Sequence, residues 1–221
     1  MDEVIVRVCR TIACLARLCI MSFLAGCREA TPTDIGRKVP MSLDKVSAHL
    51  RRLATDGLIK RRRSGTWCYC SAQSPYSEQA LSGQVASWIY RMLEDPVATM
   101  RRFGVGQLRN ASRGEAQKQL HKLIFEAATA FTDLRRLQIL RRLSGGDVLT
   151  PHSMTKELHM SKAAVSRHTD KLIRRGYLKA SSSRVEPSLA GQGLSYQLAT
   201  EFKTPIHAAL FKIVSAHWKQ P

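Results

Sequence analysis

The feature that most constrains this chain is an internal repeat of 46 residues. Residues 15–60 align with residues 134–179 without a gap, at a constant offset of 119. Sixteen of the 46 aligned positions are identical, whereas chance would give roughly one identity in fifteen positions. A duplication accounts for this excess, so we expect one small domain to occur twice in the chain.

The spacing of apolar residues predicts three short helices followed by a β-hairpin in each copy. In the first copy, Gly26 is expected to end the first helix, and the second helix spans 33–39 with Pro32 or Thr33 at its start. Ser42 is expected to cap the third helix, which Gly57 ends. The core positions expected in this copy are Leu15, Leu18, Met21, Leu24, Ile35, Val39, Val46, Leu50 and Leu53.

Each third helix is followed by two runs of residues that favour β-structure. In the first copy, these runs flank Ser64-Gly65 within residues 58–70, which predicts a hairpin with a tight turn. In the second copy, the run Gly176-Tyr177-Leu178-Lys179 is expected to be followed by a longer tip, residues 182–193, before Leu194–Leu198 returns. The chain is therefore expected to be mainly α with small β-hairpins.

Three motifs in each copy resemble the winged helix-turn-helix domains of ArsR and MarR type bacterial regulators. Residues 15–21 and 134–140 carry an Arg-Leu-x-Ile core, residues 41–50 and 160–169 share Met-Ser and a Val-Ser-x-His core, and the strands start with Gly-Leu-Ile-Lys and Gly-Tyr-Leu-Lys. The resemblance covers about two thirds of the chain. It implies an α+β fold of two tandem winged helix-turn-helix domains, in which the third helix reads DNA and the hairpin is the wing.

The charge distribution agrees with a polyanionic partner. We divide the chain into a first winged-helix domain (1–74), a helical connector and linker (75–112), and a second winged-helix domain with a C-terminal helix (113–221). These segments carry formal charges of +7, +1 and +10, within a total of +18. Because duplex DNA carries closely spaced phosphates, two basic domains favour double-stranded DNA as partner.

Four helices outside the repeated motifs have apolar faces that need partners. They are expected at 2–13, 77–94, 115–130 and 204–218, with Pro96 terminating the second. In the resembling family, such terminal helices build the dimer interface. Packing of all four against one another would make a single chain a pseudo-dimer, while a homodimer of chains stays the alternative.

The DNA-contacting residues are expected on the outward faces of the third helices and on the wings. Lys162 and Arg167 are the candidates for guanine contacts, and the basic residues near the helix ends and in the first wing are expected to meet phosphates. His49 and His168 are assigned packing or capping roles. The full set of candidates is Ser42, Leu43, Lys45, Ser47, Arg51, Arg52, Arg61, Arg62, Arg63, Ser161, Lys162, Ala164, Ser166, Arg167, Lys171, Arg174 and Arg184.

The sequence offers no pattern for catalysis, a metal or a cofactor. A phosphate-binding glycine loop, a His-Glu-x-x-His motif and a nucleophile elbow are all absent from it, so we expect no enzyme and no cofactor. All six cysteines (Cys9, Cys14, Cys19, Cys27, Cys68 and Cys70) fall in the first copy. They are interpreted as buried apolar residues, with a redox or metal switch as the open alternative.

Arginines interrupt the apolar segment 4–26, and the chain starts Met-Asp-Glu, so we expect neither a signal peptide nor a membrane span but a cytoplasmic, nucleoid-associated protein. The expected function is a sequence-specific, double-stranded DNA-binding transcriptional regulator with two unequal winged-helix units. A plasmid or phage replication initiator, a nucleoid-associated protein, and a winged-helix protein-interaction scaffold are the alternatives.

Overall fold

The computed structural model describes residues 1–104, 112–182 and 193–218. The first half consists of α1 (Asp2–Ile12), α2 (Leu15–Ala25), α3 (Pro32–Lys38), α4 (Leu43–Thr55), β1 (Lys60–Ser64) and β2 (Trp67–Ser71). Two helices follow, α5 (Leu81–Glu94) and α6 (Pro96–Arg102). The second half consists of α7 (Arg113–Thr129), α8 (Leu134–Leu143), α9 (Pro151–Glu157), α10 (Lys162–Arg174), β3 (Leu178–Ser182), β4 (Leu194–Leu198) and α11 (Pro205–Ala216).

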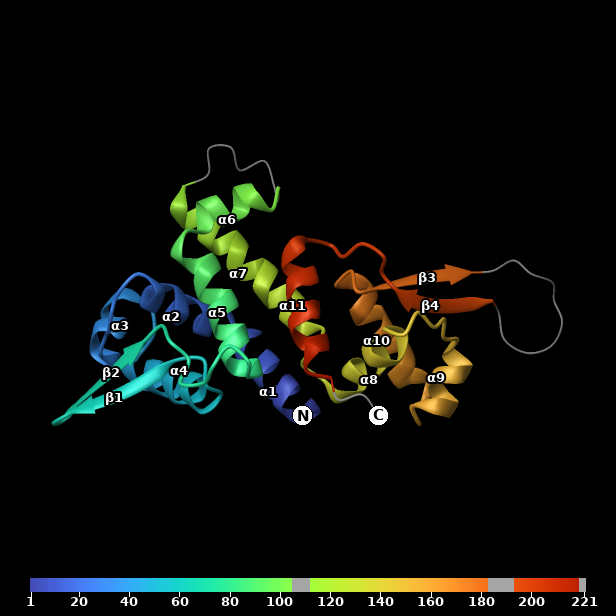
Figure 1. Cartoon of the computed structure of the whole chain (residues 1–221), viewed down its shortest axis with the longest axis horizontal. Helices are drawn as coiled ribbons and strands as arrows, with labels where there is room; N and C mark the ends of the chain where they lie inside the picture. Colours follow the sequence, from blue (N-terminus) through green and yellow to red (C-terminus); the bar gives the residue numbers. More distant parts are fainter. Residues whose placement is uncertain (105–111, 183–192, 219–221) are drawn as a thin grey trace.

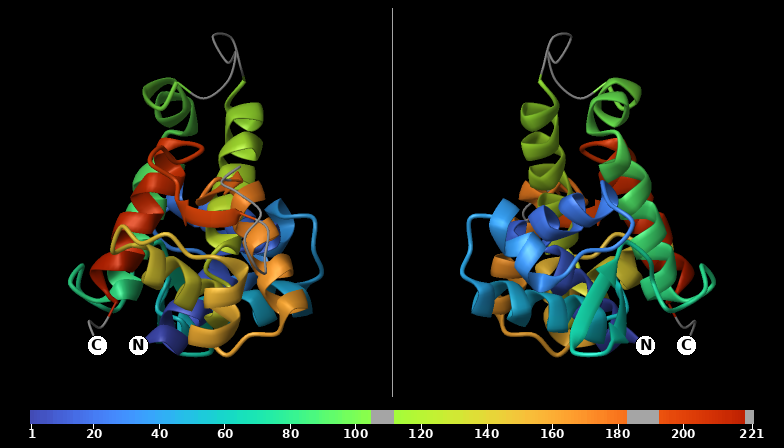
Figure 2. Two further views of the ribbon diagram at one scale, coloured as in Figure 1. Left: turned by 90° about the vertical axis from the view of Figure 1, so that its right-hand side faces the viewer. Right: turned by 90° about the vertical axis from the view of Figure 1, so that its left-hand side faces the viewer.

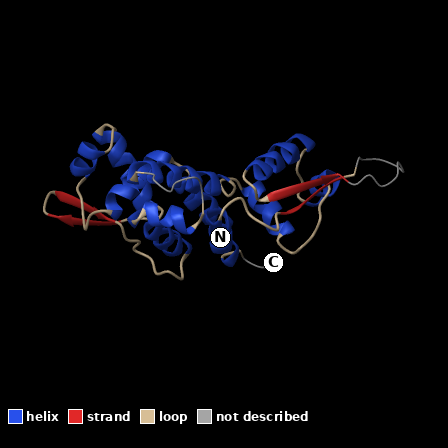
Figure 3. Ribbon diagram, turned by 90° about the horizontal axis from the view of Figure 1, so that it is seen from above, coloured by secondary structure: helices blue, strands red, loops and turns tan. Residues whose placement is uncertain are grey.

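The molecule is mostly helical, with one antiparallel hairpin at each end. The β1–β2 and β3–β4 hairpins extend in opposite directions, and α1, α5, α7 and α11 lie between them (Figure 1; Figure 3). In the side views, α11 (red) lies beside α5 (green) (Figure 2), and the two helices are in contact. Among the described residues, no helix combines the length and the apolar character needed to cross a membrane.

Two pairs of corresponding helices begin and end at residues that differ by 119 positions. This holds for α3 and α9 and for α4 and α10. Both α3 and α9 begin at a Thr-Pro pair, in which Thr31 or Thr150 accepts a hydrogen bond from the third backbone N–H and proline takes the first helical position. The cap of α3 is therefore Thr31, and the predicted helix start at Pro32 or Thr33 is corrected to Pro32.

Backbone contacts at aligned positions are also the same. Gly57 and Gly176, which follow the last residues of α4 and α10 after one intervening residue, both have positive φ, 70° and 72°. Glycine adopts this conformation without steric cost. The segment before α3 pairs with β2 through Ala30 and Cys70, and the segment before α9 pairs with β4 through Leu149 and Tyr196. Each hairpin is thus tied to its own helices by one extra β-bridge.

One arginine holds the first two helices of each half together. The Nε of Arg17 on α2 donates to the carbonyl of Thr11 on α1, and the Nε of Arg136 on α8 donates to the carbonyl of Ala130 directly after α7. The two arginines and the two carbonyls both differ by 119 positions. An identical residue pair in the sequence therefore makes an identical contact in space.

A second pair of aligned contacts has its charges reversed. In the first half, Arg7 Nε lies 3.1 Å from Asp56 Oδ1. At the aligned positions of the second half, Glu126 Oε1 lies 3.6 Å from Arg175 Nη1. Each pair connects the first helix of its half, α1 or α7, to the residue after α4 or α10. The electrostatic attraction is thus retained although neither residue is identical.

The helices in the centre of the molecule pack on each other reciprocally. Helix α1 packs against α7 and α8, while α7 packs against α1 and α2, and α5 packs against α11. Asp2 Oδ1 lies 2.7 Å from Arg141 Nη2, and at the exchanged positions His121 Nε2 lies 2.6 Å from Ser22 Oγ. A contact of residue i with j that recurs as j with i is the pattern of a two-fold symmetric interface.

Several expectations about individual elements are wrong. Leu15, expected in the core, is 51% exposed as the first residue of α2, and the aligned Leu134, the first residue of α8, is 41% exposed. Helix α5 starts at Leu81 rather than at residue 77, and Pro96 opens α6 because its missing N–H is not needed in a first turn.

The first hairpin turns at Gly65-Thr66 rather than at Ser64-Gly65, since Ser64 still pairs with Trp67. The tip expected at 182–193 lies largely outside the described residues.

Candidate nucleic-acid interface

Helices α4 and α10 each bury one face and leave the other free. Val46, Leu50 and Leu53 of α4 are at most 1% exposed, and Val165 and Leu172 of α10 are equally buried. The spacing of these residues places them on one side of each helix. The opposite side carries the polar and basic residues that the sequence assigns to DNA.

On α4, the exposed candidates are Ser42, Leu43, Lys45 and Arg51, and Ser47 is half-buried. Ser42 occupies the N-cap position without a side-chain capping hydrogen bond. Its hydroxyl is therefore not used by the backbone of its own helix.

Arg52 of α4 is bound within its own half. Its Nε lies 2.8 Å from Asp56 Oδ2 and 3.1 Å from Thr11 Oγ1. Asp56 is buried, and the hydrogen bond from Arg52 to Thr11 connects this ion pair at the end of α4 to α1. A role of Arg52 in contacting phosphate would compete with that pair.

On α10, the predicted outward residues Lys162, Ser166 and Arg167 are exposed. Ser161 caps the helix, because its hydroxyl oxygen accepts a hydrogen bond from the backbone N–H of Ala164 at 3.2 Å. Ala164 itself is only 3% exposed, which corrects its assignment to the outward face. It lies one turn before the buried His168, on the side of α10 that packs inward.

Three basic residues, Lys171, Arg174 and Arg175, lie at the end of α10. Arg174 is exposed, and burial together with the neighbouring Arg175 and Arg174 lowers the pKa of Lys171. Arg175 is instead held by Glu126 at 3.6 Å. The positive charges available here are therefore those of Lys171 and Arg174.

The first wing presents its arginines to solvent on a strand that is exposed throughout, residues 60–64. Arg62 forms an ion pair with Glu29 at 2.7 Å and lies 4.8 Å from the centre of the Tyr69 ring. Arg61 Nη2 donates to Cys68 Sγ at 3.1 Å. These contacts orient two of the three wing arginines, and Arg184, the candidate in the second wing, lies outside the described residues.

One exposed residue near the wing turn was not assigned a role from the sequence. Trp67 is 59% exposed and pairs with Ser64 next to the turn. A large aromatic side chain that remains exposed beside basic residues often marks a binding surface. The alternation of inward and outward residues along the strand does not by itself predict this exposure.

His168 has the structural role expected for it. It is 4% exposed, its Nδ1 lies 3.9 Å from Asp133 Oδ1, and burial lowers its pKa. The aligned His49 is half-buried, and burial followed by Arg17 and Lys45 lowers its pKa as well. Both imidazoles are therefore favoured in the neutral form and lie against their own domains.

Only two of the six thiols, Cys9 and Cys70, are buried, and the other four are half-buried, so the interpretation of all six as buried residues is wrong for those four. Burial raises the pKa of the fully buried Cys9, and burial also raises the pKa of Cys70 to about 11. Within the described ranges, no cluster of three or more histidine, cysteine or acidic residues is arranged to hold a metal ion.

The geometry of the second half agrees with a known family. Residues 133–180 match the family described as bacterial regulatory protein, arsR family. This segment is an ArsR-like helix-turn-helix domain. It runs from the cap of α8 through α9 and α10 into β3, and so contains the capping serine and the exposed face of α10.

The arsenic resistance transcriptional regulator ArsR2 of Pseudomonas putida is also similar to this chain. The two are 27% identical over 93 residues, which is 42% of this chain and 63% of that regulator. The chain thus spans less than two thirds of the relative that it matches. The likeness supports an ArsR-like winged helix.

Proposed function

We propose that this protein is a sequence-specific regulator of transcription that binds double-stranded DNA through two unequal winged-helix domains. The domains are 1–74 and 113–221, joined by the connector 75–112. The observation that carries the proposal is the ArsR-like helix-turn-helix at 133–180, whose helix α10 presents Lys162 and Arg167 to solvent. Bidentate arginine and lysine contacts to guanine are the commonest specific readout in the major groove.

A second helix-turn-helix in the first half is supported by the aligned limits of α3/α9 and α4/α10. The shared Arg17/Arg136 contact and the charge-reversed Arg7–Asp56 pair point to the same duplicated framework. Both halves are basic, with +7 and +10 formal charges. We therefore propose that α4 and the β1–β2 wing form the second DNA-binding surface.

The reciprocal packing of α1 with α7 and of α5 with α11 supports an intrachain pseudo-dimer. In this arrangement one chain carries both recognition helices, and they need not read the same bases. The first unit would rely on the arginines of its wing, whereas the second would rely on the exposed residues of α10. DNA binding would then place the protein at the nucleoid.

Selection from a random duplex pool, followed by a salt titration of the best sequence, tests the proposal. We expect an enriched motif with two unlike half-sites, bound by one chain per duplex. Changing Arg61, Arg62 and Arg63 together to Ala should weaken binding to every duplex and flatten the salt dependence, because fewer phosphates are neutralised. Arg91→Ala is a matched control, since Arg91 is an exposed residue of α5 outside both proposed DNA surfaces.

The outcome of the selection separates the possible roles. Enrichment of the motif at promoters would support regulation, while repeated copies at a replication origin would support an initiator. Absence of enrichment, with affinity that collapses as salt rises, would contradict sequence-specific regulation.

A further inference from the structure

Three arginines gather where the two halves of the chain meet: Arg10 in the last turn of α1, Arg17 in the first turn of α2 and Arg136 in the first turn of α8. Arg10 Nε donates to the carbonyl of Thr132 at 2.8 Å, a hydrogen bond that joins residues 122 positions apart and connects the two halves. Thr132 also accepts from Arg136, whose Nη2 lies 2.7 Å from its hydroxyl oxygen. We call these three arginines the central arginine cluster.

Backbone carbonyls complete the geometry of the cluster. Arg17 Nη2 donates to the carbonyl of Arg10 at 2.8 Å, and Arg136 Nε donates to the carbonyl of Ala130 at 3.1 Å. The guanidinium groups are therefore held beside two connections, the one between α1 and α2 and the one between α7 and α8. A carbonyl accepts a hydrogen bond but has no net charge, so these contacts position the arginines without neutralising them.

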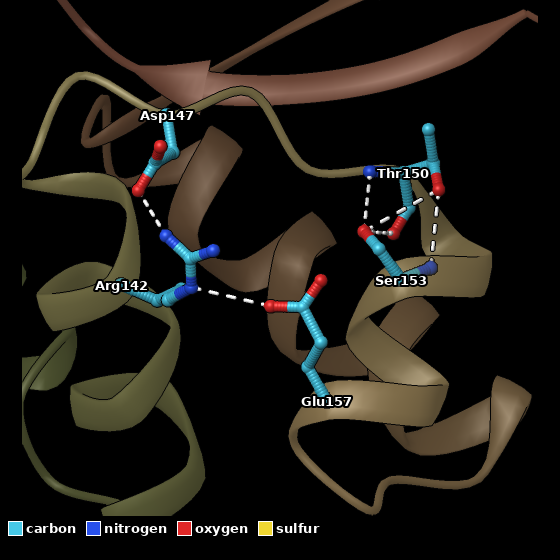
Figure 4. Close-up of polar contacts among 5 residues, drawn as sticks. All are labelled: Arg142, Asp147, Thr150, Ser153 and Glu157. Atoms are coloured by element: carbon cyan, nitrogen blue, oxygen red, sulfur yellow. Dashed lines mark hydrogen bonds and ion pairs between the residues drawn. The ribbon is translucent and has the colours of Figure 1, made fainter.

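Other arginines of α8 are neutralised within the chain. Arg142 forms ion pairs with Asp147 and Glu157 (Figure 4), and Arg141 forms one with Asp2 at 2.7 Å. Among the described residues, the three arginines of the central arginine cluster form no ion pair. The cluster therefore has positive charge that an anion from outside the chain can neutralise.

In the second half, the cluster lies close to the exposed face of α10. Burial is the main cause that lowers the pKa of Arg136, and Arg10 and Arg167 lower it further, while Asp133 acts in the opposite direction. Arg167 is the exposed α10 residue that we propose to contact guanine. Asp133 Oδ1 also lies 3.9 Å from Nδ1 of His168, the next residue of that helix. The cluster thus adjoins the proposed DNA surface of α10.

In the first half, the cluster lies close to α4 in the corresponding way. Burial lowers the pKa of His49, and the charges of Arg17 and Lys45 lower it further. Lys45 is an exposed residue of α4. The cluster thus extends from Arg17 beside α4 to Arg136 beside α10, with Arg10 between them.

Arg10 is the most accessible member of the cluster. It is exposed, and it donates one hydrogen bond among the described residues, through Nε. Arg17 and Arg136 are half-buried, and each donates two hydrogen bonds within its own half. The residue aligned with Arg10 is Thr129, so the first half alone supplies this arginine.

We propose that the central arginine cluster binds the DNA phosphates midway between the two half-sites, with Arg10 as the main contact. This site depends on the proposed function, in which α4 and α10 enter successive major grooves. Recognition helices placed in this way are about 34–36 Å apart, one turn of the duplex, so the minor groove between them faces the protein. Arginine suits the phosphates that border this groove because its guanidinium makes charge-assisted and often bidentate hydrogen bonds to them.

A double-mutant cycle between protein and DNA tests the contact. The central phosphates of the selected duplex are replaced by uncharged methylphosphonates, and both duplexes are titrated with the natural chain and with Arg10→Gln. We expect the neutralised duplex to bind the natural chain about tenfold more weakly, because charged hydrogen bonds to phosphate are lost. Arg10→Gln should bind both duplexes with the same, lowered affinity.

Arg91→Gln is the matched control for this cycle. Arg91 is also exposed and also donates from Nε to a backbone carbonyl, that of Ser87, but it belongs to α5. This variant should respond to the neutralised duplex as the natural chain does. An equal loss of affinity for the natural chain and Arg10→Gln on the neutralised duplex would overturn the contact.

A salt titration on a duplex of arbitrary sequence makes the test independent of sequence specificity. Arg10→Gln should lower the slope of log affinity against log salt concentration by about one, because one fewer phosphate is neutralised. Arg10→Lys keeps the positive charge and should keep the slope, even if loss of the bond to Thr132 lowers the thermal midpoint of the free chain. An unchanged slope for Arg10→Gln would overturn the cluster as a DNA contact.

The two proposals fail in different ways. An enriched motif together with an unchanged slope for Arg10→Gln would remove the cluster and leave the regulator. Absence of an enriched motif would contradict sequence-specific regulation, whereas a lowered slope on the arbitrary duplex would still support phosphate binding by the cluster.

Discussion

The two halves of the molecule share a backbone framework but fill it with different side chains. The first half has an aliphatic centre that includes Ile12 and Leu58, whereas the second has Phe131 and Tyr177 at the aligned positions. The aromatic centre continues through Phe202, Phe211 and Trp218. The difference teaches that a few helix starts, glycines and buried contacts hold this framework, while the core and the surface are free to diverge.

A single core side chain should contribute more to the free energy of unfolding in the second half than in the first. Tyr177→Ala should lower the free energy of unfolding by about 4 kcal/mol, because it empties a fully buried aromatic site. Leu58→Ala should cost about 3 kcal/mol. Urea unfolding followed by circular dichroism measures both, and a smaller effect for Tyr177 than for Leu58 would contradict the greater weight given to the aromatic core.

The reversed ion pairs should be exchangeable between halves. Asp56→Ala should cost about 2 kcal/mol, less than a fully buried pair, because Arg7 and Arg52 are 50% and 43% exposed. The double variant Arg7→Glu with Asp56→Arg recreates the polarity of the second half and should recover part of this loss. A double variant less stable than Asp56→Ala would show that neighbouring residues, and not the pair alone, determine which position carries the positive charge.

Helices α4 and α10, the proposed recognition helices, differ at several exposed positions, and one of them is held by an arginine in α10 alone. Arg167 of α10 aligns with Ala48 of α4, so Arg167→Ala makes the second unit resemble the first there. It should lower specific affinity by about 1–3 kcal/mol and relax one base position. Binding measured on single-base variants of the selected duplex checks this, and an equal loss on every sequence would make Arg167 a phosphate contact instead.

The capping threonines of α3 and α9 should contribute equally to the stability of their halves. Thr31→Ala and Thr150→Ala should each cost about 1 kcal/mol, because each removes the acceptor that satisfies a first-turn N–H. Thermal unfolding compares the two variants. A large cost for one cap alone would show that only that half limits the stability of the chain.

The smallest expected difference between the two halves is in the stability of the starts of α3 and α9 at low pH. Hydrogen bonds from Thr31 lower the pKa of Asp34, whereas the aligned residue of the second cap is Ser153, which does not titrate. Stabilisation by Asp34 is therefore fully present above its unfolded pKa and is lost as pH falls through its lowered folded pKa. Amide exchange should accelerate at the start of α3 in acid but not at the start of α9, and equal acceleration would contradict the role of Asp34.

Local signals in the sequence predicted much of this fold. The Thr-Pro pairs, the glycines after α4 and α10, and the apolar steps within these helices act over one or two turns, so they can be read from a single stretch of chain. The identity of Arg17 and Arg136 was visible in the alignment, but the sequence did not predict that both side chains bind backbone carbonyls. The exposed basic face of α10 followed from the same periodicity.

Other features needed long-range information. Ala164 is small enough for either face of α10, and only the packing of that helix decided that it is buried. The pairing of Arg52 with Asp56 could have been predicted from the sequence, since residues four apart on a helix are neighbours. The pairing of Arg62 with Glu29 joins residues 33 positions apart, and no pattern in the wing indicated it.

The sequence by itself determined that one framework occurs twice, the order of its repeated helices and hairpins, and that both halves are basic. Those properties depend on neighbouring residues and on composition, which a linear pattern records. Only the tertiary structure decided that Asp2 meets Arg141 where His121 meets Ser22, and that Arg10 meets Thr132. Such contacts join residues about 100 or more positions apart, and their partners are set by the packing of whole helices.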